Sequence, residues 1–136
     1  MQQARTEILY RDTTIAIEYN PEGEWIYANW RGYQNYDTVV AGCEKIQELM
    51  KEIACFRILN DNTRVEGQWS TASRWVAEEW FSSLRANGLQ LFAWVYSPSM
   101  LSRLSASKAV KLAKSPEYIK VFDEITLAED WLRSNA

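Results

Sequence analysis

The spacing of apolar residues changes from an extended to a helical period near residue 37, and this change constrains the fold more than any other feature. Before it, three segments rich in β-branched and aromatic residues are predicted to be strands: Glu7 to Tyr10, Thr13 to Tyr19 and Glu24 to Trp30. The connections between them, at residues 11–12 and 20–23, are too short for crossovers. The opening of the chain is therefore predicted to form an antiparallel meander.

Four helical segments are predicted after the meander. Apolar residues recur every three or four positions from Val40 to Ile53, with charged residues between them, which is typical of an amphipathic helix beginning near Asp37. The later helices are recognised by their ends, because Ser, Thr and Pro favour helix starts and Gly favours helix ends. They run from Ser70 or Thr71 to Asn87-Gly88, from Ser97-Pro98 to Ser115-Pro116 as one helix or two, and from a capping box of Thr126 and Glu129 to Leu132.

Three short apolar segments lie between these helices and are predicted to be strands. Cys55 to Leu59 ends at Asn60-Asp61-Asn62-Thr63, a cluster that favours a turn. Leu89 to Tyr96 is almost continuously apolar, as expected of a strand covered on both faces, and it is placed near the centre of the sheet. Tyr118 to Phe122 is predicted to be the last strand.

Strands that alternate with helices need crossover connections, and such connections produce a largely parallel sheet. Together with the opening meander, this order predicts an α/β fold with a single mixed sheet and helices packed on it. The length of 136 residues suits one domain with a continuous core, covering residues 1–136.

The residue composition excludes several classes of function. The chain has no histidine, so it lacks the commonest general base and the commonest zinc ligand, and neither a metal nor a cofactor is expected. Its five glycines are widely spaced and match no phosphate-binding loop. A net charge of −3 with scattered basic residues disfavours nucleic-acid binding.

A cytoplasmic location is expected. Arg5 and Glu7 interrupt any apolar stretch at the N-terminus, so no signal peptide is predicted. The longest apolar run, Leu91 to Tyr96, is too short to span a membrane. Cys43 and Cys55 lie within apolar patterns and are predicted to be buried free thiols.

The element order and several short motifs together resemble the SpoIIAA-like branch of the STAS superfamily. The motifs are Trp30-Arg31-Gly32-Tyr33, Leu59-Asn60-Asp61, Glu78-Glu79-Trp80-Phe81, Gly88, and Phe122-Asp123 with Glu129-Asp130-Trp131-Leu132. The resemblance covers nearly the whole chain. It implies a cytoplasmic bacterial regulatory or ligand-binding module without enzymatic activity, related in fold to anti-sigma-factor antagonists and to CRAL-TRIO-type lipid carriers.

The resemblance also directs attention to Thr63. Antagonists of that superfamily carry a phosphorylatable Ser or Thr just after an Asp, at the start of the helix that follows a central strand, where a helix N-terminus favours phosphate. Here the corresponding place reads Asp61-Asn62-Thr63-Arg64, without the usual Asp-Ser-Ser/Thr-Gly run. Thr63 is the nearest hydroxyl, and it stands as the candidate phosphosite.

Two groups of residues are candidates for a ligand-binding or partner-binding site. Asp61 and Thr63 follow a predicted parallel strand, and ligands of open α/β sheets gather beyond the carboxyl ends of strands. The alternative for Asp61 is that it only caps or turns the chain. Seven Trp and seven Tyr are hard to bury completely, so some are expected to form a groove or a subunit contact. The candidates are Trp30, Tyr33, Tyr36 and Trp69, and the alternative for each is ordinary packing at the edge of the core.

These observations favour a non-enzymatic regulatory or protein-interaction module whose partner is another protein or a second copy of the chain. The surplus of apolar and aromatic residues leaves open a carrier or sensor of a small apolar ligand, held between helices and sheet. A third interpretation is an enzyme that uses carboxylates alone, with Asp61 as the base, but the sequence offers no second catalytic group.

Overall fold

The opening of the chain forms an antiparallel meander of three strands, as predicted. The computed structural model describes residues 6–114 and 116–135, and its meander consists of β1 (Glu7–Arg11), β2 (Ile15–Asn20) and β3 (Trp25–Tyr33). Side chains of the connecting residues hold both turns. Asp12 Oδ1 accepts hydrogen bonds from the backbone N–H of Thr14 and Ile15 at 2.8 and 3.0 Å, and Asn20 Oδ1 accepts one from Gly23 N–H at 2.9 Å.

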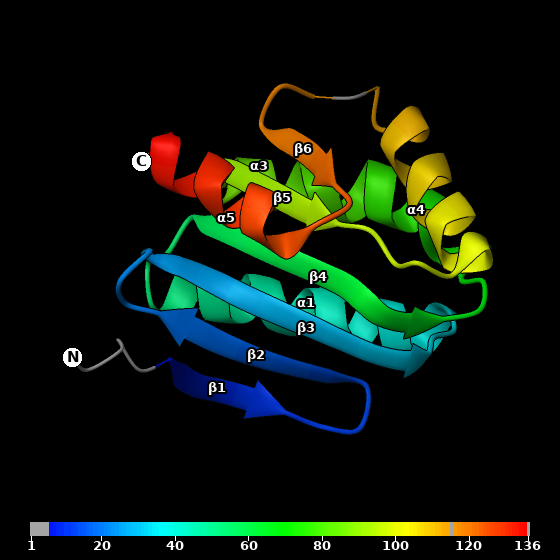
Figure 1. The fold of residues 1–136 in the computed structure, drawn as a ribbon, viewed down its shortest axis with the longest axis horizontal. Coiled ribbons are helices and arrows are strands. Elements are labelled where there is room, and N and C mark those ends of the chain that lie inside the picture. The colour runs from blue at the N-terminus through cyan, green and yellow to red at the C-terminus, as the bar shows by residue number, and fades with distance from the viewer. Residues whose placement is uncertain (1–5, 115, 136) are drawn as a thin grey trace.

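The sheet contains six strands that lie side by side in chain order (Figure 1). After β3 the pairings become parallel, and they bring in β4 (Arg57–Glu66), β5 (Leu91–Val95) and β6 (Ile119–Phe122). Each parallel pairing is joined by a helical crossover, as the alternation of periods in the sequence requires. The prediction of a single mixed α/β sheet is therefore confirmed.

Helix α1 (Tyr36–Glu52) connects β3 to β4 and begins at a reciprocal cap. Asn35 Oδ1 accepts from Thr38 N–H, while Thr38 Oγ1 accepts from Asn35 N–H, both at 2.9 Å. One face of the helix buries side chains that the sequence pattern placed inward, namely Cys43 and Ile46, and it buries both Leu49 and Met50, between which the pattern left a choice. Val39 rather than Val40 is the buried residue of the first turn.

The next crossover, residues 70–86, is a continuous helical run whose geometry changes along its length. It passes through a 3₁₀ turn (η1, Ser70–Ala72), an α-helical turn (α2, Ser73–Trp75), a π-helical turn (η2, Val76–Trp80) and a final α-helical stretch (α3, Phe81–Ala86). The left-handed residue Gly88, with φ of +105°, ends it as expected. Two further helices follow, α4 (Met100–Leu112) and α5 (Ile125–Ser134).

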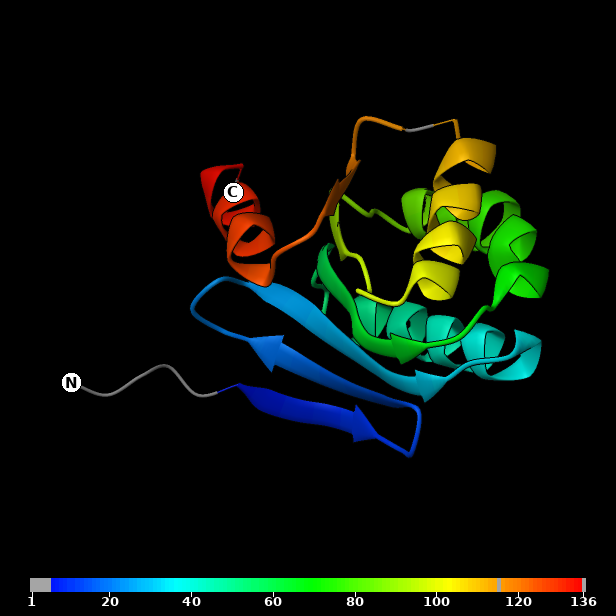
Figure 2. The same cartoon turned by 45° about the vertical axis from the view of Figure 1, so that its right-hand side comes forward.

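The helices cover the sheet unequally. Helix α1, the 70–86 run and α4 pack on one face around the larger hydrophobic core, whereas α5 packs on the other face (Figure 2). The larger core takes Phe92 and Trp94 from β5, and the α5 side takes Ala93 and Val95. β5 is thus covered on both faces, but it lies between β4 and the edge strand β6 rather than near the centre. β5 is apolar on both faces because α5 packs over that end of the sheet.

The largest difference from the sequence prediction lies in β4. The cluster Asn60 to Thr63 does not form a turn, because β4 continues for ten residues to Glu66 alongside β3. The pairing extends from Ile26↔Ile58 to Tyr33↔Glu66, with a shift in register between Asn29 and Arg31. Asn60 and Asp61 are tolerated here because both are buried and their side chains accept hydrogen bonds from Trp30 and Tyr27.

Helix α5 also begins differently from the prediction. Its N-cap residue is Glu124, and within the described residues no side chain caps it, so the capping box of Thr126 and Glu129 was wrong. The helix is held instead by Arg57 of β4, whose buried guanidinium donates to the carbonyl oxygens of Leu132 in α5 and Gly23 in the turn before β3.

Among the described residues, no helix is both long enough and apolar enough to cross a membrane.

Candidate functional site

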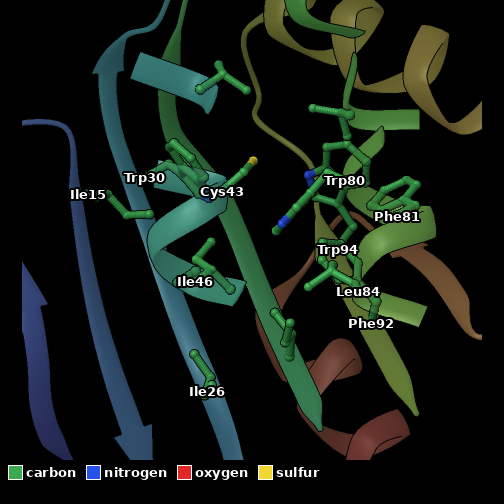
Figure 3. Close-up of a cluster of buried hydrophobic side chains, with 14 of the residues drawn as sticks. Ile15, Ile26, Trp30, Cys43, Ile46, Trp80, Phe81, Leu84, Phe92 and Trp94 are labelled. Atoms are coloured by element: carbon green, nitrogen blue, oxygen red, sulfur yellow. The ribbon is translucent and has the colours of Figure 1, made fainter. Parts of the chain in front are cut away.

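Four of the seven tryptophans gather around one internal space, which we call the tryptophan chamber. It lies between α1, the 70–86 helical run and strands β3 to β5 (Figure 3). Its volume is about 20 Å³, which by the same measure holds one or two water molecules. The residues that line it are Trp30, Gln34, Val39, Cys43, Asn60, Asn62, Val65, Trp69, Val76, Trp80 and Trp94.

The strands place Trp30 and Asn60 on the chamber side. Alternate residues of a strand face opposite sides of the sheet, so Trp30, Asn60 and Asn62 point toward the helices. Trp30 Nε1–H donates to Asn60 Oδ1 at 2.8 Å, and both side chains are buried. This bond explains why an asparagine is tolerated in the middle of β4.

Trp69 joins the chamber to α4. Its backbone N–H donates to Ser105 Oγ at 2.9 Å, and its Nε1–H donates to Ser102 Oγ at 3.3 Å. Its ring stacks on Trp94 with centroids 6.1 Å apart. A serine pair on α4 therefore fixes one wall of the chamber.

Two indole groups in the chamber carry unused hydrogen-bond donors. Trp80 Nε1 and Trp94 Nε1 are buried and have no partner among the residues that the structure describes. Their rings lie across from Trp30 and Cys43, with the indole nitrogens on the side that faces α1 (Figure 3). A buried donor without a partner costs about 1–3 kcal/mol, so an arrangement that keeps two of them calls for an explanation.

Gln34, which also lines the chamber, carries an unused acceptor. Its Nε2 donates to the carbonyl oxygens of Arg31 at 2.9 Å and Thr14 at 3.4 Å, which fixes the orientation of the amide. Its Oε1 is buried and, within residues 6–114 and 116–135, has no donor. Three polar atoms of residues that line the chamber, two donors and one acceptor, thus have no partner among the residues that the structure describes.

The chamber is electrically neutral. Its lining in the described part of the chain includes no Asp, Glu, Lys or Arg. Cys43 reaches it, but burial raises the pKa of this thiol well above its ordinary value, so it remains protonated at neutral pH. Cys43 and Cys55 are both buried and free, as predicted.

Asp61 lies on the opposite face of the sheet from the chamber. Its Oδ2 accepts from the Tyr27 hydroxyl at 2.6 Å, and its Oδ1 accepts from Thr63 N–H at 2.9 Å. The carboxylate is only 3% exposed. Burial, followed by the hydrogen bond to Asp61, raises the pKa of Tyr27 above its ordinary value. Both oxygens of the candidate base are therefore held by structural partners.

Thr63 is placed differently from a residue at a helix start. It is a half-buried residue inside β4, and seven positions separate it from the beginning of the 70–86 helical run. The sequence prediction located it in a turn, and that location was wrong. Its use as a phosphosite remains a prediction.

The predicted aromatic group is divided between interior and surface. Trp30 and Trp69 are buried and line the chamber, whereas Tyr33 and Tyr36 are 76% and 44% exposed at the end of β3 and the start of α1. Sequence reasoning missed Trp80, Trp94 and Gln34 as members of a site. Their helical or strand spacing predicts core packing, and no local signal indicates that their polar atoms lack partners.

A second surface feature was also missed. Helix α4 buries its small residues, Ser102, Ser105, Ala106 and Ala109, against the 70–86 helical run. It exposes large apolar side chains on its outside: Met100 at 67%, Leu101 at 54% and Leu104 at 59%. We call these three residues the α4 outer face. The small residues repeat at helical spacing, and this was the signal in the sequence that could have identified the buried side.

The comparisons with known proteins concern the fold. No family model matches this chain, and no curated protein matches it. A solved structure that is similar is that of an uncharacterised protein of the DUF3478 family with a SpoIIAA-like fold, from Shewanella loihica PV-4. The two chains are 19% identical, the match covers 97% of this chain and 98% of that one, and the TM-score is 0.51. The SpoIIAA-like fold expected from the sequence is confirmed.

Proposed function

We propose that this SpoIIAA-like chain is a non-enzymatic regulatory module that binds another protein through the α4 outer face. The observation that carries the proposal is the arrangement of α4, which buries its small residues and leaves Met100, Leu101 and Leu104 more than half exposed. A helix that only served the core would place large apolar side chains inward, because their burial supplies most of the stabilisation.

The three side chains form a compact patch because they share the first turns of one helix. Residues four positions apart lie on the same side of a helix, so Met100 and Leu104 are stacked neighbours, and Leu101 adjoins them. Full burial of such a side chain is worth about 1.5–3 kcal/mol, so removing all three from water supplies several kcal/mol toward a complex. A helix that presents such anchors fits an apolar groove on a partner.

Charged groups border the patch. Arg103 forms an ion pair with Asp123 at 2.6 Å, and its guanidinium lies over the Tyr96 ring at 5.3 Å from the centroid. An apolar centre with a charged rim is the usual anatomy of a protein–protein contact. The rim is exposed, so its contribution is to orientation and specificity rather than to affinity.

The side chains that could support catalysis favour a non-enzymatic role. The chain has no histidine, and both oxygens of the buried Asp61 carboxylate accept hydrogen bonds from Tyr27 and Thr63. Burial raises the pKa of both Cys43 and Cys55, which keeps the thiols unreactive at neutral pH. Free thiols also suit the reducing cytoplasm, where we place the module.

Co-purification with a matched pair of variants tests this function. Tagged wild-type protein, Leu104→Asp and Leu127→Asp are recovered from cells of the source organism, and light scattering measures the mass of each complex. Leu127 is the control because it is a leucine of α5 with similar exposure, 53% against 59%. We expect a protein partner with the wild type and with Leu127→Asp, and loss of it with Leu104→Asp at unchanged thermal stability. Equal recovery with all three, or a monomer without partner in every case, contradicts the proposal.

A further inference from the structure

We propose that the apolar groove that receives the α4 outer face is walled by a partner helix that carries carboxylates as well as apolar residues. This inference rests on the proposed function and names the chemistry of the partner. Beyond the α4 outer face, the exposed positions of the same helix are lysines, namely Lys108 and Lys111, and exposed Lys114 follows just after the helix end. We call these three residues the α4 lysine row.

The α4 outer face and the α4 lysine row lie on one side of the helix. Met100, Leu104 and Lys108 follow one another at intervals of four residues, and Lys111 lies seven residues beyond Leu104. Both intervals return to the same side of an α-helix. Leu104 and Lys111 are about 10 Å apart along the helix axis, at a rise of about 1.5 Å per residue, so one partner helix can reach both.

The charge around α4 is opposite in sign to that of the rest of the protein. Residues 80–116 contain Arg85, Arg103 and the α4 lysine row but no Asp or Glu, which gives a formal charge of +5. The whole chain has a net charge of −3, so the residues outside this stretch together carry −8. An acidic partner segment is therefore attracted to the region of α4 and repelled by the rest of the chain.

The ammonium groups of the α4 lysine row are available to a partner. Within residues 6–114 and 116–135, none of the three forms an ion pair. Lys108 Nζ donates to the carbonyl oxygen of Ser70 at 3.4 Å, and this neutral acceptor leaves its charge uncompensated. Arg103, by contrast, is already paired with Asp123. Carboxylates of a partner would supply the counter-charges that the row lacks.

Helix stability alone does not account for the α4 lysine row. A lysine in the last turn of a helix interacts favourably with the helix dipole, and Lys111 meets that need. Lys108 lies almost one turn earlier, where this effect falls off. Lys114 has a left-handed backbone, with φ of +62°, at a position where glycine is the usual residue. A lysine held in this conformation indicates a use for its side chain outside the helix.

The lengthwise order of the two groups favours a protein partner over a membrane. A helix that lies in a membrane surface has an apolar face along its whole length, with lysines on its polar face. On α4 the exposed apolar residues occupy the first turns, and the lysines occupy the later turns and the helix end. A partner helix with leucines toward one end and glutamates toward the other matches this order.

Fluorescence anisotropy with designed peptides tests the proposal on the full chain. The first probe is a labelled helical peptide with glutamates in its first half and leucines in its second, for antiparallel pairing with α4. Matched probes replace the glutamates by glutamines or the leucines by alanines. At an ionic strength of about 0.05 M we expect saturable binding of the glutamate probe and about five- to tenfold weaker binding of the glutamine probe, because each exposed ion pair contributes about twofold. The alanine probe should bind weakest, since apolar burial supplies most of the affinity.

Lysine variants assign the preference for glutamate to the α4 lysine row. Combining Lys108→Gln, Lys111→Gln and Lys114→Gln should make the glutamate and glutamine probes bind equally. Lys51→Gln changes the exposed last-turn lysine of α1 and should keep the full preference. Lys114→Gly should weaken binding of the glutamate probe about twofold without lowering the thermal stability, because glycine adopts the left-handed backbone without strain.

The outcomes separate this inference from the proposed function. Equal affinity for the glutamate and glutamine probes, or no saturable binding of either, would overturn the acidic partner. Binding of the wild type to phosphatidylserine vesicles but not to the glutamate probe would overturn it in favour of a membrane surface. The proposed function is judged separately, by loss of the co-purified partner in Leu104→Asp. The comparison of the probes on the wild type remains decisive even if the triple lysine variant does not fold.

Discussion

Gly42→Ala is expected to destabilise the protein although alanine is the better helix former. Gly42 lies inside α1 and faces the ring of Trp30. A Cβ added at this position would lie 2.3 Å from Trp30 Cη2 and 2.6 Å from its Cζ3. These distances are far below van der Waals contact, so either the indole or the helix has to move.

The balance of three effects determines the size of the change. Replacing glycine in a helix interior by alanine stabilises by roughly 1 kcal/mol. Overpacking a buried contact costs about 1–3 kcal/mol. Displacing Trp30 also weakens its 2.8 Å bond to Asn60, which is worth roughly 1 kcal/mol. The net destabilisation is therefore about 1–3 kcal/mol.

Urea unfolding followed by tryptophan fluorescence measures this change, and a double-mutant cycle assigns it to the clash. In a Trp30→Leu background the ring is absent, so Gly42→Ala should stabilise by roughly 1 kcal/mol. Ala41→Gly, at the exposed neighbouring position of α1, gives the propensity effect alone. If Gly42→Ala stabilised the wild type as much as it stabilises the Trp30→Leu background, the packing of Trp30 against α1 would be refuted.

Three further predictions concern the pair of Tyr27 and Asp61 and the two cysteines. A double-mutant cycle with Tyr27→Phe and Asp61→Asn should give a coupling energy of about 1.5–3 kcal/mol in urea unfolding, since the bond joins a hydroxyl to a buried carboxylate; a value near zero would contradict that geometry. Because the pKa of Tyr27 is raised in the folded state, its contribution to stability is complete below the ordinary tyrosine pKa and declines as pH rises above about 10. Tyr27→Phe should make that alkaline decline shallower, and an unchanged slope would count against the shift. Cys43 and Cys55 are buried, so a thiol reagent should label them no faster than the protein unfolds. The absorbance of the group that the reagent releases measures the labelling rate. Rapid labelling of the native protein would show that the thiols are accessible.

The sequence predicted those parts of the fold that local patterns determine. The meander follows from short turns around Asp12 and Asn20, and α1 follows from its apolar spacing. The mixed sheet was accessible because crossover rules leave few topologies for this element order, whereas the SpoIIAA-like fold was expected from the resemblance to that family. In these segments, local preference and long-range packing agree.

The prediction failed where long-range pairing overrides local preference. Asn60 to Thr63 has the composition of a turn, but pairing with β3 and the bond from Trp30 keep it in β4. This error changed the predicted site. Successive side chains of a strand face opposite sides of the sheet, so Asp61 faces away from Asn60 and Asn62. Asp61 thereby lies on the opposite face of the sheet from Trp30 and Trp69, which belong to the other group of candidates.

The chamber was beyond the reach of sequence reasoning for a related reason. A tryptophan at a core position carries the same local signal whether or not its N–H finds a partner. Only the relative placement of the π-helical turn, β5 and Gln34 leaves polar atoms of Trp80, Trp94 and Gln34 without a partner among the described residues. The α4 outer face is different in this respect. The small residues on the buried side of α4 repeat at helical spacing in the sequence, so the outer side could have been identified from them.

Site-specific photo-crosslinking in living cells tests the protein-binding claim most directly. A benzophenone amino acid is placed at Leu104 on the α4 outer face or at Leu127 on α5, two positions of similar exposure on different helices. We expect a covalent adduct of defined mass from position 104 and none from position 127. Adducts of the same identity from both positions, or no adduct from position 104, would contradict the assignment of the α4 outer face as the surface that binds a partner.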